Sequence, residues 1–234
     1  MYTGIYDENP QRFYEIKADG EEQKSRIEQK GKREYLLCCE CEGKLSKYEK
    51  YADENLYGKN NNAKAILVKQ LKTPDGKVIL YEFENFDYKS MKLFLDSLLW
   101  RLLISKSFDT PEYDEELIEK LRISLFNETP LNPNEFPCLI QSIMNSNNEI
   151  VKGFILSPIV KNNGDTTILS ILIDGFEYNF YISEKLPNDE IIPFLQKNGN
   201  LKLIGRKIED MPELIALVKP KMDHITDRVK KSSR

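Results

Sequence analysis

The first part of the chain carries two kinds of hydrophobic pattern. Between Glu40 and Tyr57, apolar and aromatic residues recur at steps of three and four, which is the spacing of one face of an amphipathic helix. Two apolar-rich runs, 65–71 and 78–83, flank the sequence Thr-Pro-Asp-Gly-Lys at 73–77. Because Pro presets φ and Gly accepts positive φ, these runs predict a β-hairpin. The face of the helix consists of Leu45, Tyr48, either Tyr51 or Ala52, and Leu56.

A long apolar stretch follows the hairpin. Asp87 is a residue type that caps helices, and the segment from Asp87 to Lys106 carries a wide apolar stripe. A stripe of this width predicts a buried central helix. Thr110-Pro111-Glu112 opens a further helix to about Phe126, since Pro is favoured in the first helical turn. The apolar stripe consists of Met91, Phe94, Leu95, Leu98, Leu99, Leu102 and Leu103, with the single tryptophan, Trp100, near it.

The pattern changes after a segment, 127–137, that holds three prolines and predicts a boundary. Beyond it, short apolar runs indicate strands, and Asp174-Gly175 between two of them is a hairpin signal. A helical pattern begins at Met211. The predicted strands are 138–144, 151–160, 167–173, 176–183 and 201–208.

These patterns predict an α+β fold with two regions. Residues 1–128 would form an α+β region built on the hairpin and the long central helix. Residues 129–234 would form an antiparallel sheet with flanking helices.

Composition restricts the classes of protein. The chain has 234 residues, of which 40% are hydrophobic and 31% are charged, as in ordinary globular proteins. Its formal net charge is -4, whereas a dedicated duplex-DNA binder is more often basic overall. The longest apolar stretch, Leu93–Ile104, is interrupted by charged residues and is too short to span a bilayer. The N-terminus has no signal-peptide pattern, so we expect a cytoplasmic protein without membrane partners.

The cysteines are the most specific chemical feature of the sequence. Three of the four, Cys38, Cys39 and Cys41, lie within four residues, and the fourth is Cys138. Such a cluster suits metal ligation in a reducing compartment better than a disulfide framework. Cys38 and Cys41 form a Cys-x-x-Cys pair, and two thiolates at this spacing can bind one face of a tetrahedral zinc ion. A closed structural site needs two more ligands, from a set of Cys39, Cys138, His224 and carboxylates.

Other interpretations of the thiols stay open. Some of them could be buried small apolar side chains, which is a common role of free cysteine. Thioredoxin-like redox chemistry is less favoured, since no βαβ pattern surrounds the pair.

Three segments carry a family resemblance. Leu36–Tyr51 reads LLCCECEGKLSKYEKY and resembles the second half of a zinc knuckle in bacterial HNH-endonuclease-like proteins. Asp87–Phe94, continuing to Ser97–Arg101, looks like the central helix of the same group, and Met1–Phe13 is similar to its tyrosine- and phenylalanine-bearing segment. The resemblance implies a nucleic-acid-linked role, including a role in defence against phage or mobile elements.

The chain departs from the family pattern at the catalytic residues. Members begin with a first Cys-x-x-Cys followed by Ser-His-Ile-Ile-Pro, and both are absent here. An HNH-type nuclease needs a histidine as general base and further side chains that hold a divalent metal. The only histidine is His224, in a charged C-terminal stretch. Either Met1 lies inside a longer gene or the chain is a degenerate member, and we expect no nuclease activity from it as given.

The remaining charged groups have simpler roles. Paired carboxylates could hold Mg²⁺, but acidic residues are also favoured in a first helical turn, which is the stronger interpretation. The acidic residues are Glu82, Glu84 and Asp87 after the hairpin, and Asp114, Glu115, Glu116 and Glu119 at the start of the next helix. We interpret Arg101 as a buried, paired charge in preference to a phosphate contact.

Two partner classes remain. A basic C-terminal stretch could attract DNA or RNA. Alternatively, the chain is a non-enzymatic interaction or scaffold domain that docks a protein through the C-terminal sheet or its edge. The candidate nucleic-acid-binding residues are Lys219, Lys221, Arg228, Lys230 and Lys231.

Overall fold

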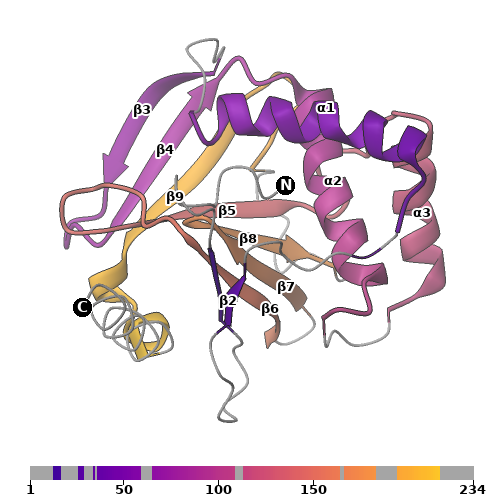
Figure 1. Ribbon diagram of the computed structural model, residues 1–234. Coiled ribbons are helices and arrows are strands. Elements are labelled where there is room, and N and C mark those ends of the chain that lie inside the picture. Colours follow the sequence, from indigo (N-terminus) through magenta and orange to yellow (C-terminus); the bar gives the residue numbers. More distant parts are fainter. Residues whose placement is uncertain are drawn as a thin grey trace, which may run out of the picture.

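The computed structural model shows a mixed α/β fold, as the sequence predicts (Figure 1). It describes residues 13–16, 26–28, 34, 36–58, 65–108, 113–163, 166–182 and 194–216. The helices in these ranges are α1 (Cys39–Asn55), α2 (Tyr88–Ile104) and α3 (Glu115–Phe126), with a 3-10 turn at Ile208–Asp210. The strands are β1 (Phe13–Ile16), β2 (Arg26–Glu28), β3 (Ile66–Lys72), β4 (Val78–Glu84), β5 (Cys138–Met144), β6 (Phe154–Asn163), β7 (Thr166–Ile173), β8 (Phe176–Tyr181) and β9 (Leu201–Lys207).

All of these strands belong to one sheet, in the order β2-β1-β6-β7-β8-β5-β9-β4-β3. Most neighbours are antiparallel, but β1 runs parallel to β6, and β5 runs parallel to β9. The prediction of a purely antiparallel C-terminal sheet is therefore wrong. Alternating side chains identify a strand and its buried face, but they do not encode the direction of its neighbour.

The sheet crosses the predicted boundary at residue 129. β9, from the C-terminal region, lies between β5 and β4 and pairs antiparallel with β4 from Val78↔Arg206 to Phe83↔Leu201. The main core cluster also takes residues from both regions. The division of the chain into regions 1–128 and 129–234 stays a prediction. Strands from the two regions hydrogen-bond to each other in one sheet.

The β3–β4 hairpin is closed by its turn residues. Thr73 Oγ1 lies 2.5 Å from Asp75 Oδ1 and accepts the backbone N–H of Val78 at 3.1 Å. Gly76 has φ of +71°, which a side chain would disfavour. These local bonds set the register of the hairpin, and β3 is left at the edge of the sheet.

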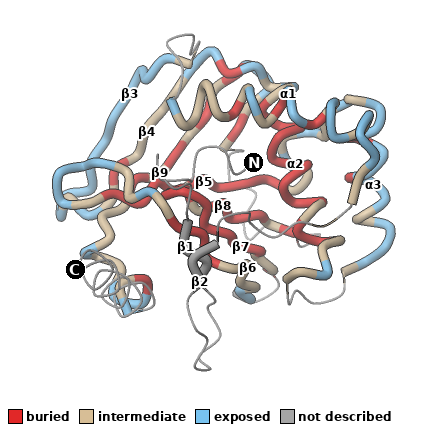
Figure 2. The backbone as a smooth tube through the Cα atoms, in the orientation of Figure 1, coloured by how far each residue is buried: buried red, intermediate tan, exposed pale blue. Residues whose placement is uncertain are grey.

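Among the described helices, α2 buries the most residues. Asp87 caps it, since its Oδ1 accepts the backbone N–H of Ser90 at 2.6 Å. Every residue from Met91 to Trp100 is buried, and the red segment of α2 in Figure 2 shows this. The helix packs against the sheet in one core cluster, in which Phe94 and Tyr178 form an edge-to-face pair with ring centroids 6.1 Å apart.

The lysine of a buried ion pair in α2 also forms a hydrogen bond to the loop that follows α3. Lys92 Nζ lies 2.6 Å from Asp96 Oδ1 and donates to the carbonyl of Glu135 at 2.8 Å. Burial raises the pKa of Asp96, against the attraction of Lys92. Both side chains are at most 4% exposed. The loop is therefore held against the core by the buried ammonium group of Lys92.

No helix in the described ranges is long and apolar enough to cross a membrane.

Candidate functional site

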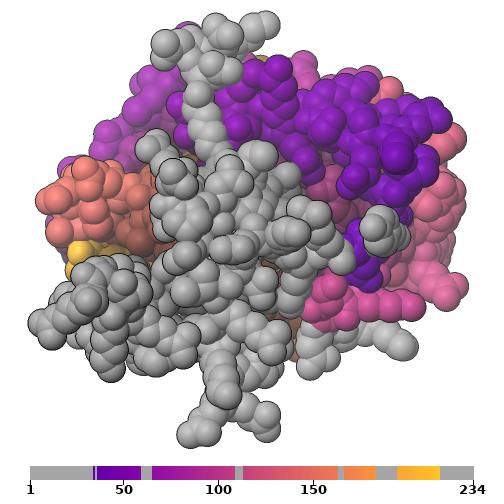
Figure 3. All heavy atoms as spheres, in the orientation of Figure 1, coloured from indigo at the N-terminus to yellow at the C-terminus, as the bar shows by residue number. Residues whose placement is uncertain are grey.

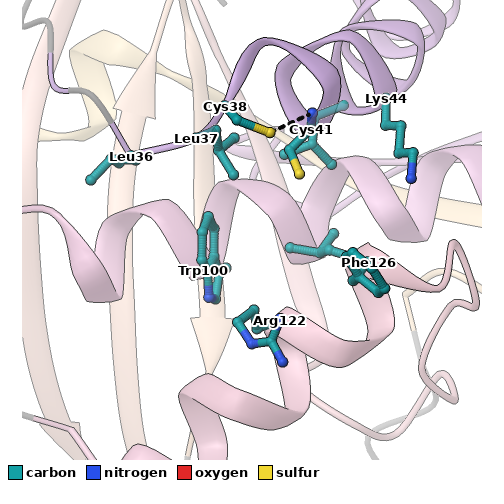
Figure 4. A pocket seen from close by; sticks show the side chains of 10 residues that line it. Leu36, Leu37, Cys38, Cys41, Lys44, Trp100, Arg122 and Phe126 are labelled. Atoms are coloured by element: carbon teal, nitrogen blue, oxygen red, sulfur yellow. Dashed lines mark hydrogen bonds between the residues drawn. The ribbon is translucent and has the colours of Figure 1, made fainter.

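Cys38 and Cys41 lie together at the start of α1. Cys38 is the N-cap of the helix, and its Sγ accepts the backbone N–H of Cys41 at 3.5 Å. Figure 4 shows this bond as a dashed line, with both sulfurs beside the same pocket. Cys38 is exposed and Cys41 is half-buried. The sequence spacing thus places two thiols side by side at a helix N-terminus that is open to solvent.

The pocket beside the thiols has a volume of about 270 Å³ and mostly apolar walls. α2 contributes Trp100, and α3 contributes Leu125 and Phe126. Phe126 is 59% exposed, so an aromatic ring stands at the surface next to the two sulfurs. Because Trp100 is the only tryptophan in the chain, tryptophan fluorescence reports on one position, which lines this pocket and belongs to the core. The remaining lining residues are Leu36, Leu37, Cys38, Cys41, Lys44, Leu45 and Arg122.

The two thiols have different acidities. The pKa of Cys38 is lowered, first by the backbone N–H of Cys41 and then by the thiol of Cys41, which both donate to the Cys38 sulfur. The pKa of Cys41 is raised, first because its thiol is held by that hydrogen bond and then by desolvation. Lys44 acts in the opposite direction on Cys41. The pair therefore loses a first proton more readily than an isolated thiol does, and the hydrogen bond that the two sulfurs share holds back the second.

Two cations stand at the rim of the pocket. Lys44 Nζ lies 5.3 Å from the ring centre of Phe126 and 3.5 Å from a carboxylate oxygen of Glu40. Arg122 donates two hydrogen bonds to Glu119, at 2.6 and 2.7 Å. Both cations thus have a carboxylate partner, and the rim is close to neutral.

The donor set fits half of a structural zinc site. Two thiolates at Cys-x-x-Cys spacing supply two of the four tetrahedral positions, and the Cys41 N–H to Cys38 Sγ bond stabilises a thiolate. Among the residues that the structure describes, no group of three or more His, Cys, Asp or Glu side chains gathers around a common point. Cys138 lies buried in β5, where burial strongly raises its pKa, and it does not line the pocket.

Several predicted site residues fall outside the described ranges. The candidate nucleic-acid-binding residues Lys219, Lys221, Arg228, Lys230 and Lys231 lie beyond residue 216, as does His224. Their assignment stays a prediction from the sequence.

The other charged candidates have structural partners. Arg101 forms an ion pair with Glu49 on α1, and its side chain is 19% exposed, which confirms the interpretation as a paired charge. Asp114 is the N-cap of α3 and accepts the backbone N–H of Glu116 at 3.0 Å. Glu115 and Glu116 lie in the first turn of the same helix. Glu82 lies 3.9 Å from both Lys69 and Lys202 across the sheet.

The contribution of α3 to the site is absent from the sequence prediction. Arg122, Leu125 and Phe126 are 80 or more positions away from Cys38, and no local motif links them to it. The one signal that the sequence offered for this contribution was an aromatic residue, Phe126, at the predicted end of a helix. The comparisons with known proteins add nothing to this picture, because no family model, curated protein or solved structure matches the chain.

Proposed function

We propose that this chain is a nucleic-acid-associated protein of HNH-like ancestry that binds without cutting, and in which Cys38 and Cys41 are half of a structural zinc knuckle. The observation that supports it best is the position of the two thiols. They sit at the N-terminus of α1 with both sulfurs on one open pocket, which places two of the four donors of a tetrahedral site side by side. The link to phage or mobile-element defence belongs to the same proposal.

The absence of catalysis follows from the residues that HNH chemistry requires. The sequence contains one histidine, and it lies in the basic C-terminal stretch, far along the chain from the thiols. Without a second histidine or its equivalent, a general base and a metal ligand cannot both be supplied by imidazoles. Nucleic-acid binding is then the remaining role, and we assign it to the basic stretch at 219–231.

Fluorescence anisotropy with labelled single-stranded and duplex DNA and with RNA tests this function. We expect binding that weakens steeply between 50 and 200 mM salt, by roughly 10³-fold if about six phosphates are contacted. A variant in which Lys219, Lys221, Arg228, Lys230 and Lys231 are changed to Gln should lose most of this affinity. A matched control removes five cations elsewhere, at Lys69, Lys72, Lys77, Lys152 and Lys161, and should keep it. Equal loss in both variants, or no binding by the parent chain, contradicts the proposal.

A second candidate function is favoured by one specific observation. All seven residues of β3 are exposed, and β3 is the last strand at its edge of the sheet. Four of them are large and apolar, which is unusual for an exposed edge. Such a strand accepts an extended peptide by adding it to the sheet. The four residues are Ile66 (54% exposed), Leu67 (46%), Val68 (49%) and Leu71 (46%).

This alternative is a protein-interaction domain without affinity for nucleic acid. Val68→Lys would place a charge on the edge and should abolish strand addition, while the melting temperature stays unchanged because the position is exposed. Lys77→Gln in the adjoining turn is the control. Peptide-array binding that both variants retain equally would remove β3 as the docking strand.

A further inference from the structure

We infer that the half-knuckle is completed by a second copy of this chain, so that one zinc ion is held by Cys38 and Cys41 from each of two copies. The inference rests on the proposed zinc site and names the partner that closes it. Zinc binding would then join two copies of the chain into a dimer.

The first argument is the lack of further ligands among the residues that the structure describes. Cys39 is two positions before Cys41 on α1, and residues at that spacing project to different sides of a helix, so Cys39 does not reach the same ion. Consistent with this, Cys39 does not line the pocket. Cys138 is buried in β5, and no third His, Cys, Asp or Glu joins the pair among the described residues.

The second argument is access. Cys38 is exposed at the very start of α1, and both thiols line the same pocket as the exposed Phe126 (Figure 4). In Figure 3, α1 forms the indigo ridge along the upper edge of this face. A second chain can therefore approach the sulfurs without displacing a described element.

The third argument is symmetry. A tetrahedral ion bound by two identical pairs has a two-fold axis between the pairs, which is the symmetry of the commonest protein dimer. Each copy would give the same two residues, so the interface is self-complementary. The contact would also remove apolar surface from water, from Leu36, Leu37 and Phe126 of each copy, at roughly 25 cal/mol per Å².

Charge supports the same arrangement. Four thiolates leave a zinc centre doubly negative. Two helix N-termini would point at it, and each contributes a partial positive charge. Lys44 of each copy also lines the pocket, where its ion pair with Glu40 leaves the rim close to neutral.

Zinc titration of the purified, metal-free chain tests the inference, with molar mass from light scattering and metal content measured on the same samples. We expect saturation at one zinc per two chains, a doubling of the molar mass, a change in Trp100 fluorescence, and return to monomer on chelation. Co²⁺ in place of Zn²⁺ should show the absorption bands of a tetrahedral tetrathiolate.

The variants separate this site from general thiol binding. Cys38→Ser and Cys41→Ser should each lose the mass change and the tetrathiolate bands, whereas Cys39→Ser, which removes an exposed neighbouring thiol, should keep both. One zinc per chain at monomer mass overturns the second copy as partner while the zinc half of the proposed function stands. A dimer that survives chelation also overturns it. A chain that binds no zinc removes the half-knuckle as well, and leaves nucleic-acid binding to the anisotropy experiment.

Discussion

α1 and α2 are both 17 residues long, yet they serve the molecule in opposite ways. α2 buries twelve of its residues, including a lysine and an aspartate, whereas α1 buries three. The cap of α2 is the carboxylate of Asp87, whereas the first turn of α1 carries the thiols at the surface. One helix is thus held by burial along most of its length, while the other is attached along a narrow strip and leaves its N-terminus free for chemistry.

The contacts that hold α1 are correspondingly polar. Tyr48 donates to Glu128 Oε1 at 2.6 Å, and Lys47 pairs with the same carboxylate. Further along α1, Glu49 pairs with Arg101 of α2. We therefore expect α1 to be sensitive to acid and to single polar substitutions, and α2 to be sensitive to any unpaired charge.

The largest expected effect is the loss of the buried partner in α2. Lys92→Met leaves Asp96 buried without its ammonium, which should lower the free energy of unfolding by about 3–5 kcal/mol. Urea unfolding followed by circular dichroism measures it. The double variant Lys92→Met/Asp96→Leu removes both charges and should recover most of the loss. A single variant as stable as the parent would mean that Asp96 is protonated and needs no partner.

A smaller effect is expected where α1 meets the loop after α3. Tyr48→Phe keeps the ring in the core but removes the hydroxyl that donates to the Glu128 carboxylate. Hydrogen bonds to charged groups contribute about 1.5–3 kcal/mol, so the free energy of unfolding should fall within that range. The same urea experiment applies, with Tyr181→Phe as a control of equal chemistry. An equal loss in both variants would assign the effect to the ring environment.

Acid should act on the same contact. Lys47 and Tyr48, which both donate to Glu128, hold its pKa at about 2, below its ordinary value of 4.5. Because the folded pKa is the lower one, the contribution of Glu128 is complete above pH 4.5 and is lost as the pH falls through about 2. The difference in melting temperature between the parent and Glu128→Gln should shrink across this window. Curves that stay parallel from pH 6 to pH 2 would contradict it.

The smallest effect is expected at the first turn of α1. Glu40 is exposed and reaches Lys44 at 3.5 Å, and exposed pairs of this kind contribute little. Glu40→Gln should leave the melting temperature unchanged. It should strengthen zinc binding, because it removes a negative charge beside Cys38 and Cys41. Metal titration of the variant checks this, and weaker binding would indicate that Glu40 supports the site.

Part of the fold could be predicted because its causes are local. The turn at Pro74–Gly76 and the cap at Asp87 act within a few residues, and both occur where the sequence places them. The stripe on α1 left Tyr51 and Ala52 as alternatives, and the structure buries Ala52. Tyr51 instead lies at the edge of the core, where its hydroxyl oxygen accepts the backbone N–H of Asp87 at 2.6 Å.

The amino-acid sequence by itself determined most of the described helices and strands, which residue caps α2, and that two thiols stand three positions apart. It did not predict β2 (Arg26–Glu28), which lies in an almost wholly polar segment. The tertiary structure alone decided that β9 runs parallel to β5 and joins the hairpin to the rest of the sheet. It alone brought Arg122 and Phe126 beside Cys38. The physical reason is range: propensity, capping and spacing act over a few residues, whereas strand partners and pocket walls follow from burying all the apolar faces at once.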